Sequence, residues 1–459
     1  MTQPSVRDED AALAALRAVE AELNRRWPES QIEPSLARIA QLVDLLGSPQ
    51  RCYPVLHIAG TNGKTSVARM LDALLSRIGL RVGRYTSPHL QRVTERISVD
   101  GTPVSPERYV EAYHDIEPYV AMVDARSLVA MSKFEVLTGM AFAAFADAPV
   151  DAAVVEVGLG GSWDATNVAD AAVAAITPVA VDHVNYLGSD ITGIATEKAG
   201  IIKHGSVAVM APQSPEVARI IDARSAEVDA TVARDGIEFG VLQRDIAVGG
   251  QQLKLQGLGG VYSEIFLPLH GAHQARNAVL ALAAAEAFFG AGGHRCLNVD
   301  AVRDAFASVT VPGRLERVRT APSVFLDGAH NPHGAQALAA ALREEFAFRK
   351  LIAVVGVMRD KDARGILAGL EPAVDELVLT GARSPRAMDV DDLAAAAREV
   401  FDDSRVVVEH GLPDAIEAAI SMVTDTDADS DRVSGAGVVI TGSVALVGQA
   451  RTLFGHHPQ

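Results

Sequence analysis

The chain has 459 residues, of which 49% are hydrophobic and 22% are charged, and its formal net charge is -17 at pH 7. This length suggests two or three domains, and the acidic balance argues against a nucleic-acid backbone as the main partner. No apolar run approaches the length of a membrane span, the N-terminus lacks a signal-peptide pattern, and Cys52 and Cys296 stand in no metal-type spacing. We therefore expect a cytoplasmic protein that binds neither nucleic acid nor membrane.

Helices and short strands alternate along the first half of the chain. Residues 11–27 and 34–46 place apolar side chains at helical spacing and predict two amphipathic helices. Beyond them, short apolar runs end in polar or glycine-rich turns and are separated by helix-like segments, which predicts a parallel sheet covered on both faces. Ligands of such sheets lie at the carboxyl ends of the strands. The predicted strands are residues 55–59, 82–85, 152–155 and 172–181.

In the second half of the chain the strand–helix pattern is interrupted and then resumes. Residues 235–269 alternate around glycine turns, which predicts a small antiparallel ribbon. After a hinge-like segment at residues 310–314, strand and helix patterns resume without another phosphate loop. We therefore expect an α/β protein with a P-loop-type parallel-sheet domain over residues 1–311, which includes the ribbon. A smaller, Rossmann-like α/β domain would cover residues 312–459.

A glycine loop, Gly60, Thr61, Asn62, Gly63, Lys64, Thr65 and Ser66, connects the first predicted strand to a helix. Backbone N–H groups and the helix dipole at such a junction bind phosphate. Lys64 can reach the terminal phosphates of ATP, and Thr65 or Ser66 can hold Mg²⁺. The match to the ordinary phosphate-loop pattern is imperfect, because its first glycine would fall at Ile58. The alternative is a glycine-rich turn with a solvated Lys64.

Three polar residues, Ser87, Glu156 and His183, each follow a predicted strand and can all face Lys64. Phosphoryl transfer needs a metal ion, and oxygen ligands or an imidazole can hold one. Each residue also has an ordinary structural interpretation: a turn before Pro88, a helix cap or ion pair, and a core histidine. Their common position favours a metal site.

Two further segments carry polar residues whose role the sequence leaves open. Lys198 lies at the start of a predicted helix or just inside it, and alone it would be an ordinary surface lysine. Asp327 and His330 follow a strand of the second domain, where the carboxylate could bind ribose hydroxyls and the imidazole could meet an anion. The alternative there is a proline-containing turn with a helix cap at Asn331.

Together these motifs resemble the folylpolyglutamate synthase and dihydrofolate synthase family, within the wider Mur-ligase-like group. The resemblance runs over nearly the whole length, and that family's loop also lacks the first glycine, which accounts for Ile58. Thr65 departs from the glycine that many members have. The landmarks are residues 60–64, 86–90, 134–138, 156–161, 164–167, 182–183, 198–201, 273–278, 312–314, 327–332 and 360–362.

The resemblance implies a bifunctional bacterial ligase that joins the carboxylate of dihydropteroate or a reduced folate to the amine of L-glutamate. ATP would be the co-substrate and would convert the carboxylate into an acyl phosphate. Two Mg²⁺ ions are implied, one on Thr65, Ser87 and Glu156 and the other on His183. In similar enzymes the lysine that matches Lys198 is carbamylated, and its carboxylate can hold or orient the second ion.

The same resemblance assigns the remaining contacts. The catalytic residues would be Lys64, Lys198 and His330. Asn277 would contact adenine, Arg314 phosphate and Asp327 ribose, beside the loop Gly60, Thr61, Asn62, Gly63, Lys64, Thr65 and Ser66. Glutamate would lie near His330 and Ser443. The folate would contact Ser35, Leu36, Ser132, Lys133, Phe134, Glu135, Trp163, Asp164 and Ala165, of which Trp163 is not the residue expected before that Asp.

The predicted enzyme is a monomer whose two domains close about residues 312–313 during turnover. Two alternatives remain open at this point. A Mur-type ligase acting on a cell-wall precursor would need another N-terminal domain, and only about 50 residues precede the loop strand. A non-ligase P-loop ATPase would hydrolyse ATP without folate or glutamate.

Overall fold

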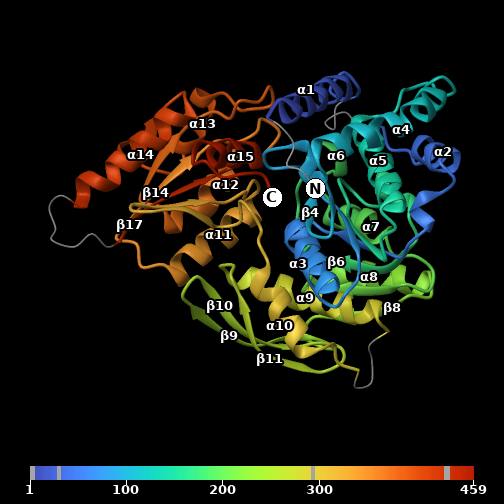
Figure 1. Ribbon diagram of the computed structural model, residues 1–459. Coiled ribbons are helices and arrows are strands. Elements are labelled where there is room, and N and C mark those ends of the chain that lie inside the picture. The colour runs from blue at the N-terminus through green and yellow to red at the C-terminus, as the bar shows by residue number, and fades with distance from the viewer. Residues whose placement is uncertain (1–5, 28–32, 291–294, 428–434) are drawn as a thin grey trace.

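The computed structural model describes residues 6–27, 33–290, 295–427 and 435–459. Two sheets organise the chain, and the segment around residue 312 separates them (Figure 1). The first part carries an eight-stranded sheet and a three-stranded ribbon, and the second part carries a six-stranded sheet. The predicted α/β fold, with a parallel-dominated N-terminal sheet and a separate C-terminal sheet, is confirmed. None of the described helices is long and apolar enough to cross a membrane.

The large sheet has the strand order β4-β3-β2-β5-β1-β6-β7-β8. Neighbouring strands are parallel from β2 to β8, whereas β3 and β4 form an antiparallel edge that the sequence analysis did not predict. The strands are β1 (Val55–Ala59), β2 (Val82–Tyr85), β3 (Ile97–Val99), β4 (Thr102–Pro103), β5 (Ala152–Glu156), β6 (Ala171–Ile176), β7 (Val207–Met210) and β8 (Thr231–Arg234).

Helices cover both faces of this sheet, because successive side chains of a strand point to opposite sides. Leu56 and Ile58 of β1 pack into the core under α3 (Lys64–Arg77) and α9 (Ala272–Phe288). Val55 packs into the opposite core. That core lies under α1 (Val6–Leu23), α2 (Ala37–Leu45), α4 (Pro106–Asp124) and α5 (Lys133–Asp147). Helices α6 (Val184–Leu187), α7 (Ile191–Ala199), α8 (Pro215–Glu227) and α10 (Val299–Ser308) complete this part.

Strand β6 is shorter than predicted, since it ends at Ile176 and not at residue 181. The segment that follows contains Pro178, which has no N–H for a sheet ladder. Its backbone groups bond to the glycine loop instead. Thr61 N donates to Pro178 O at 2.9 Å, and Ala180 N donates to Thr61 Oγ1 at 3.0 Å. The end of β6 is therefore diverted toward the phosphate loop.

The predicted ribbon is present as an antiparallel sheet of β9 (Gly240–Ala247), β10 (Gly250–Gln256) and β11 (Val261–Leu267). A tight turn joins β9 to β10 through Gly249, whose φ of 78° favours glycine. Leu253, Leu255 and Ile265 pack into the α3 and α9 core. The ribbon lies below the two larger parts in Figure 1.

The C-terminal sheet has the order β12-β13-β17-β14-β15-β16, parallel throughout except for β12, which is antiparallel to β13. Its strands are β12 (Glu316–Thr320), β13 (Ser323–Leu326), β14 (Lys350–Val355), β15 (Glu376–Leu379), β16 (Val406–Val408) and β17 (Ala436–Thr441). Helices α11 (Pro332–Glu345), α12 (Ala363–Leu370) and α13 (Val390–Arg398) pack on one face. Helices α14 (Leu412–Asp427) and α15 (Val444–Leu453) pack on the other.

Candidate active site

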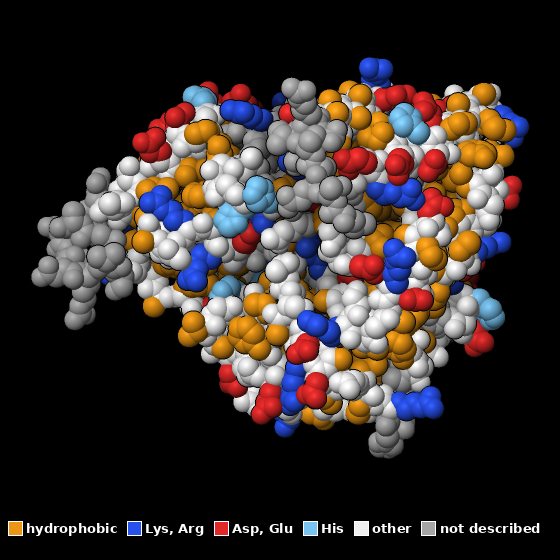
Figure 2. Space-filling view, viewed as in Figure 1, with side chains coloured by type: hydrophobic (Ala, Val, Ile, Leu, Met, Phe, Trp, Pro, Cys, Tyr) orange, Lys and Arg blue, Asp and Glu red, His pale blue; other side chains and the backbone are white. Residues whose placement is uncertain are grey.

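A cavity of about 900 Å³ lies between the two parts of the protein. Its walls include the glycine loop, the segments after β2, β5 and β13, the beginning of α9 and the beginning of α15. Figure 2 shows Lys, Arg and His side chains gathered along this boundary. The carboxyl ends of both parallel sheets therefore open onto one space, as expected for ligand sites in such folds.

The glycine loop takes a conformation that glycine makes possible. Gly60 has a φ of 139°, and a Cβ there would lie 1.9 Å from Thr177 Oγ1. Gly63 precedes α3 with a φ of 93°, and a Cβ there would lie 2.7 Å from Asn277 Oδ1. Lys64 is the first residue of α3, and its Nζ donates to Gly60 O at 3.2 Å. A helix N-terminus, a tight backbone loop and an ammonium group together form an anion site.

Thr65, Glu156 and Ser87 converge next to Lys64. The Thr65 hydroxyl lies 3.0 Å from both carboxylate oxygens of Glu156, and Ser87 N donates to Glu156 Oε2 at 3.4 Å. Burial raises the pKa of Glu156, an effect that the neighbouring Lys64 charge opposes. Hydroxyl and carboxylate oxygens are the hard donors that Mg²⁺ prefers, with phosphate oxygens and water as its other ligands. This donor set fits one Mg²⁺.

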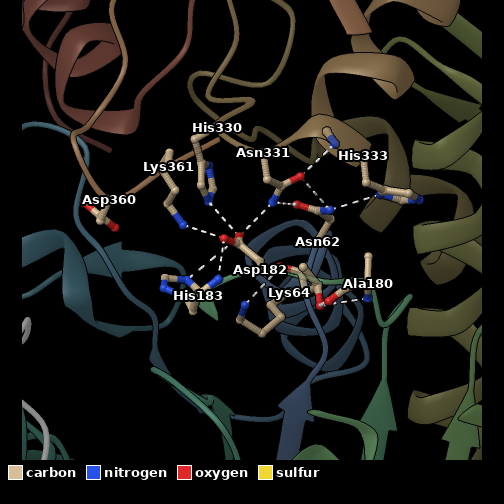
Figure 3. A network of polar contacts seen from close by, with 12 residues as sticks. Asn62, Lys64, Ala180, Asp182, His183, His330, Asn331, His333, Asp360 and Lys361 are labelled. Atoms are coloured by element: carbon tan, nitrogen blue, oxygen red, sulfur yellow. Dashed lines mark hydrogen bonds and ion pairs between the residues drawn. The ribbon is translucent and has the colours of Figure 1, made fainter. Parts of the chain in front are cut away.

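A second polar cluster, here called the Asp182 network, joins the two parts (Figure 3). Lys361 Nζ donates to Asp182 Oδ1 at 2.7 Å, and Asn331 Nδ2 donates to Asp182 Oδ2 at 2.9 Å. The Nε2 atoms of His183 and His330 each lie 3.9 Å from the same Oδ2. Burial raises the pKa of Asp182, but the charge and hydrogen bond of Lys361 oppose it, and that pKa is held well below its usual range.

The Asp182 network reaches the glycine loop through Asn62. Asn62 and Asn331 exchange amide hydrogen bonds of 3.2 and 3.0 Å, and Asn62 Nδ2 also lies 3.0 Å from His333 Nδ1. Asn331 and Lys361 lie in the landmark segments 327–332 and 360–362, in which we predicted no role for Lys361. Their meeting with Asp182 depends on the packing of two sheets, which no local pattern could indicate.

His183 and Lys198 line a small pocket together with Lys64 and Asp182. His183 has a φ of 53°, and burial lowers its pKa to about 3, so its imidazole is neutral. Among the described residues, no group of three or more His, Cys, Asp or Glu side chains is arranged to hold a metal. The second predicted metal site therefore stays a prediction.

Lys198 differs from its predicted placement. It lies in the last turn of α7, not at a helix start, and it is only 5% exposed, so the surface-lysine alternative is wrong. Its Nζ donates to Gly60 O at 2.9 Å, and it lines a small pocket that adjoins Lys64, Asp182 and His183. Burial, aided by the charge of Lys64, lowers the pKa of Lys198 to about 7.

The three residues predicted to contact the nucleotide all line the cavity. Asn277 Nδ2 donates to Gln274 Oε1 at 3.0 Å, and Arg314 Nη1 donates to Gly313 O at 3.0 Å. Asp327 accepts hydrogen bonds from Leu315 N at 2.8 Å and Ala329 N at 2.9 Å. Backbone contacts thus hold Asp327 in place, while its position on the cavity wall leaves a ligand contact open.

Most of the predicted folate residues line the cavity, but two do not. Leu36 packs against the apolar core under α5, and Lys133 Nζ donates to Asn24 Oδ1 at 2.8 Å. The residues on the wall are Ser35, Ser132, Phe134, Glu135, Trp163, Asp164 and Ala165.

Several of these wall residues also have local structural partners. Ser132 and Glu135 form a capping box at the start of α5, and Glu135 also binds Arg38 at 3.0 Å. Trp163 packs close to Gly160, where a Cβ would lie 2.8 Å from the indole. Each has a structural role, and each is also placed to contact a ligand.

The residues predicted for glutamate lie on the C-terminal side of the cavity. His330 Nδ1 lies 2.8 Å from Gly328 O, and burial lowers the pKa of His330 to about 4. Ser443 begins α15 and accepts a hydrogen bond from Leu446 N at 3.3 Å. Both side chains therefore stand at the carboxyl ends of C-terminal strands, opposite the glycine loop.

Comparison with known proteins identifies the family. Residues 132–285 match the Mur ligase middle domain, and residues 313–443 match the Mur ligase, glutamate ligase domain. The dihydrofolate synthase/folylpolyglutamate synthase of Mycobacterium tuberculosis is 60% identical over 464 residues, which cover 97% of this chain and 95% of that protein. The chain belongs to the dihydrofolate synthase/folylpolyglutamate synthase family. Its Bacillus subtilis member is 32% identical over 422 residues, covering 92% and 95% of the two chains.

Solved structures of the dihydrofolate synthase/folylpolyglutamate synthase family share this fold. The Mycobacterium tuberculosis folylpolyglutamate synthase complexed with ADP has a TM-score of 0.94 at 60% identity, covering 98% of this chain and 100% of that one. The Escherichia coli protein FolC, in complex with DHPP and ADP, has a TM-score of 0.83 at 30% identity, covering 96% and 97%. These relatives are ATP-dependent glutamate ligases, and the two complexes contain ADP.

Replacing Glu156 tests the metal site beside Lys64. Glu156→Gln removes the charge of the carboxylate but keeps its shape, so the Mg²⁺ concentration for half-maximal activity should rise about tenfold or more. Since burial raises the pKa of Glu156, the unmodified protein should also need more Mg²⁺ at a pH close to that raised pKa than at a pH well above it, because only the ionised form binds metal.

The variant should lack this pH dependence. The matched control is Glu227→Gln on α8, where the carboxylate is 69% exposed and far from the cavity wall. Mg²⁺ titrations of activity at both pH values provide the measurement. An unchanged Mg²⁺ requirement in Glu156→Gln would remove Glu156 from the metal site.

Proposed function

We propose that this protein is an ATP-dependent amide ligase that adds L-glutamate to dihydropteroate and to reduced folates. One observation carries the proposal: a single cavity brings together a phosphate loop, a wall that includes Phe134, Trp163 and Asp164, and a set of polar residues that follow strands of the C-terminal sheet. An ATPase without an acceptor substrate would need the phosphate loop but not the other two features. The family membership supports the same class of reaction.

The chemistry follows from the weakness of a carboxylate as an electrophile. The acceptor carboxylate attacks the γ-phosphorus of ATP, ADP leaves and an acyl phosphate forms. The amine of glutamate then attacks the acyl carbon, and phosphate and a proton are released as the amide forms. Lys64 stabilises charge on the transferring phosphoryl group from the start of α3. Mg²⁺ held by Thr65, Ser87 and Glu156 would neutralise negative charge there, and His183 with Lys198 would hold a second ion.

The substrates divide between the two parts in this proposal. Residues 1–311 hold the folate and bind ATP through the glycine loop, and residues 312–459 hold glutamate near His330 and Ser443. Asn277 is assigned to adenine, Arg314 to phosphate and Asp327 to ribose, so the nucleotide touches both parts and closure brings them together. Every assigned residue comes from one chain. We therefore keep the monomer as the working form, and the two free cysteines fit the cytoplasm.

Lys198 suits a carbamate because its amine is buried and its pKa is lowered to about 7. The neutral amine attacks CO₂, forms an N–C bond and loses a proton, which turns a cation into a carboxylate. Such a group beside Lys64, Asp182 and His183 would hold or orient the second Mg²⁺. A protonated lysine at this depth would instead add positive charge next to Lys64.

The function is tested with an isotope-labelled acceptor. Dihydropteroate carrying ¹⁸O in its carboxylate is incubated with the protein, ATP, Mg²⁺ and L-glutamate, and a reduced folate is tested in parallel. Mass spectrometry should find the glutamylated product and one ¹⁸O atom in each phosphate released. A product without ¹⁸O in phosphate would exclude the acyl phosphate. ATP hydrolysis with no glutamylated product from either acceptor would exclude the ligase.

Chemical rescue tests the carbamate. Lys198→Ala should lower kcat by about a hundredfold or more, because a charge-stabilising group is lost, and small carboxylic acids should restore part of it. Lys254→Ala, on the exposed side of the ribbon, is the control and should keep normal activity with or without acid. Near-normal activity of Lys198→Ala, or a large loss that no carboxylic acid relieves, would count against the carbamate.

A further inference from the structure

A buried histidine in the strand that leads to the phosphate loop has no role in the chemistry above. His57 is the third residue of β1 and is 0% exposed. The alternation of strand side chains puts it on the same face as Val55, away from α3. Its Nε2 lies 2.8 Å from Thr166 Oγ1, in the short 3₁₀ helix Ala165–Val168.

The hydrogen bonds around Thr166 fix the direction of this contact. The single hydroxyl hydrogen of Thr166 is donated to Asp164 Oδ1 at 2.5 Å. The hydroxyl must therefore accept from His57, so the proton of the imidazole is on Nε2. The other ring nitrogen, Nδ1, has no hydrogen-bond partner among the described residues. Burial lowers the pKa of His57 to about 3, which agrees with a neutral ring.

Asp164 is the last residue in this chain of contacts. It lies on the cavity wall with the other residues that are predicted to contact the folate. Its Oδ1 also accepts from Thr166 N at 3.0 Å, and its Oδ2 accepts from Leu159 N at 2.8 Å. The carboxylate is 3% exposed, so these donors set its orientation. A carboxylate has about four lone-pair sites. Thr166 and Leu159 occupy three of them, and Gly158 N also contacts the group. Asp164 can therefore accept at most one N–H of a ligand.

We propose that His57 is a positioning residue for the acceptor: acting through Thr166, it fixes the Asp164 carboxylate that recognises the N–H edge of a heteroaromatic ring. This rests on the proposed function, which puts the pterin end of the acceptor at Asp164. Gly60 follows His57 by three residues. Strand β1 thus positions both the Asp164 carboxylate, through His57, and the phosphate loop, through Gly60. It thereby fixes the distance between the pterin end of the acceptor and ATP.

A purely structural histidine would behave differently. A polar ring in the middle of a central parallel strand is costly unless it is hydrogen-bonded, and an apolar residue would fill the same space without that cost. If His57 only filled the core, its replacement would change stability and leave the relative use of ATP and acceptor unchanged. A positioning role predicts that replacing His57 weakens the use of the acceptor and leaves the use of ATP nearly unchanged.

The test compares three variants and one control. His57→Leu removes the donor, Thr166→Val removes the hydroxyl, and His57→Gln restores an N–H near the position of Nε2. Val55→Ala, on the same face of β1 and 1% exposed, is the control for packing loss. The KM for dihydropteroate, the KM for ATP, kcat and the melting temperature are measured for each.

His57→Leu should raise the KM for dihydropteroate about tenfold or more, as expected when a hydrogen-bonded charged group loses its orientation. The KM for ATP should change less than about twofold, and His57→Gln should recover most of the loss. The double variant His57→Leu/Thr166→Val should be no worse than Thr166→Val alone, because both act on one contact chain. Val55→Ala should lower the melting temperature without changing either KM.

An unchanged acceptor KM in His57→Leu, or an equal rise in both KM values, would overturn the proposal. If His57→Leu does not fold, Thr166→Val and His57→Gln give the same comparison, and additive losses in their combination would overturn it. Measurements on the unmodified protein distinguish a failure of the proposed function from a failure of the role proposed for His57. If it uses neither dihydropteroate nor a reduced folate, the proposed function fails; if it does and the variants keep its acceptor KM, only the role of His57 fails.

Discussion

The Asp182 carboxylate binds Lys361 and Asn331 of the C-terminal part from a segment that is itself hydrogen-bonded to the phosphate loop. Both members of the Asp182–Lys361 ion pair are only 7% exposed. Removing one partner of a buried pair costs roughly 3–5 kcal/mol, because the other charge is left unpaired. The position of the C-terminal part over the ATP site therefore depends on this contact more than on the exposed ion pairs of the surface.

The Asp182–Lys361 ion pair makes the stability of the contact between the two parts depend on pH. The pKa of Asp182 is held below its unfolded value, so its stabilising contribution is present above that unfolded value. It is lost as the pH falls toward the folded one. A second interdomain cluster lies at the ribbon, where Glu345 of α11 accepts from Gly271 N at 2.7 Å and contacts His270 at 2.8 Å. Gln91 contacts Thr452 and Arg451 at a third place. Of these three clusters of described residues, only the Asp182 network contacts the phosphate loop.

Local patterns predicted the elements that local interactions determine. The strands over residues 55–59 and 82–85 have their predicted bounds, since short apolar runs bounded by turn residues decide them. Strand β6 ends early because Thr61 captures the backbone after Pro178. The antiparallel edge of β3 and β4 went unpredicted, because strands of three and two residues carry almost no periodicity.

The candidate site also contains some residues that a local pattern indicates and others that only the packing of distant elements brings together. The glycine loop follows β1 and Glu156 ends β5, positions that a strand pattern can indicate, whereas the family resemblance added their roles and alone pointed to Asp164. The sequence could not reveal that Lys198 is buried in the last turn of α7 or that Lys361 reaches Asp182. It also gave no sign that His57 contacts Thr166. Each of these depends on the packing of elements distant in the chain.

The most direct test of this account is the effect of Asp182→Asn on ATP binding and on turnover, measured side by side. The substitution keeps the shape of the side chain but leaves Lys361 without its counter-charge. The exposed Asp403→Asn, whose carboxylate is 80% exposed in its ion pair with Arg398, is the control. Asp182→Asn should lower kcat by about a hundredfold or more and should weaken ATP binding by a smaller factor, because the glycine loop is intact while Arg314 and Asp327 lose their position. A kcat within about twofold of the unmodified protein, in a folded variant, would contradict the claim that this carboxylate holds the two halves of the active site together.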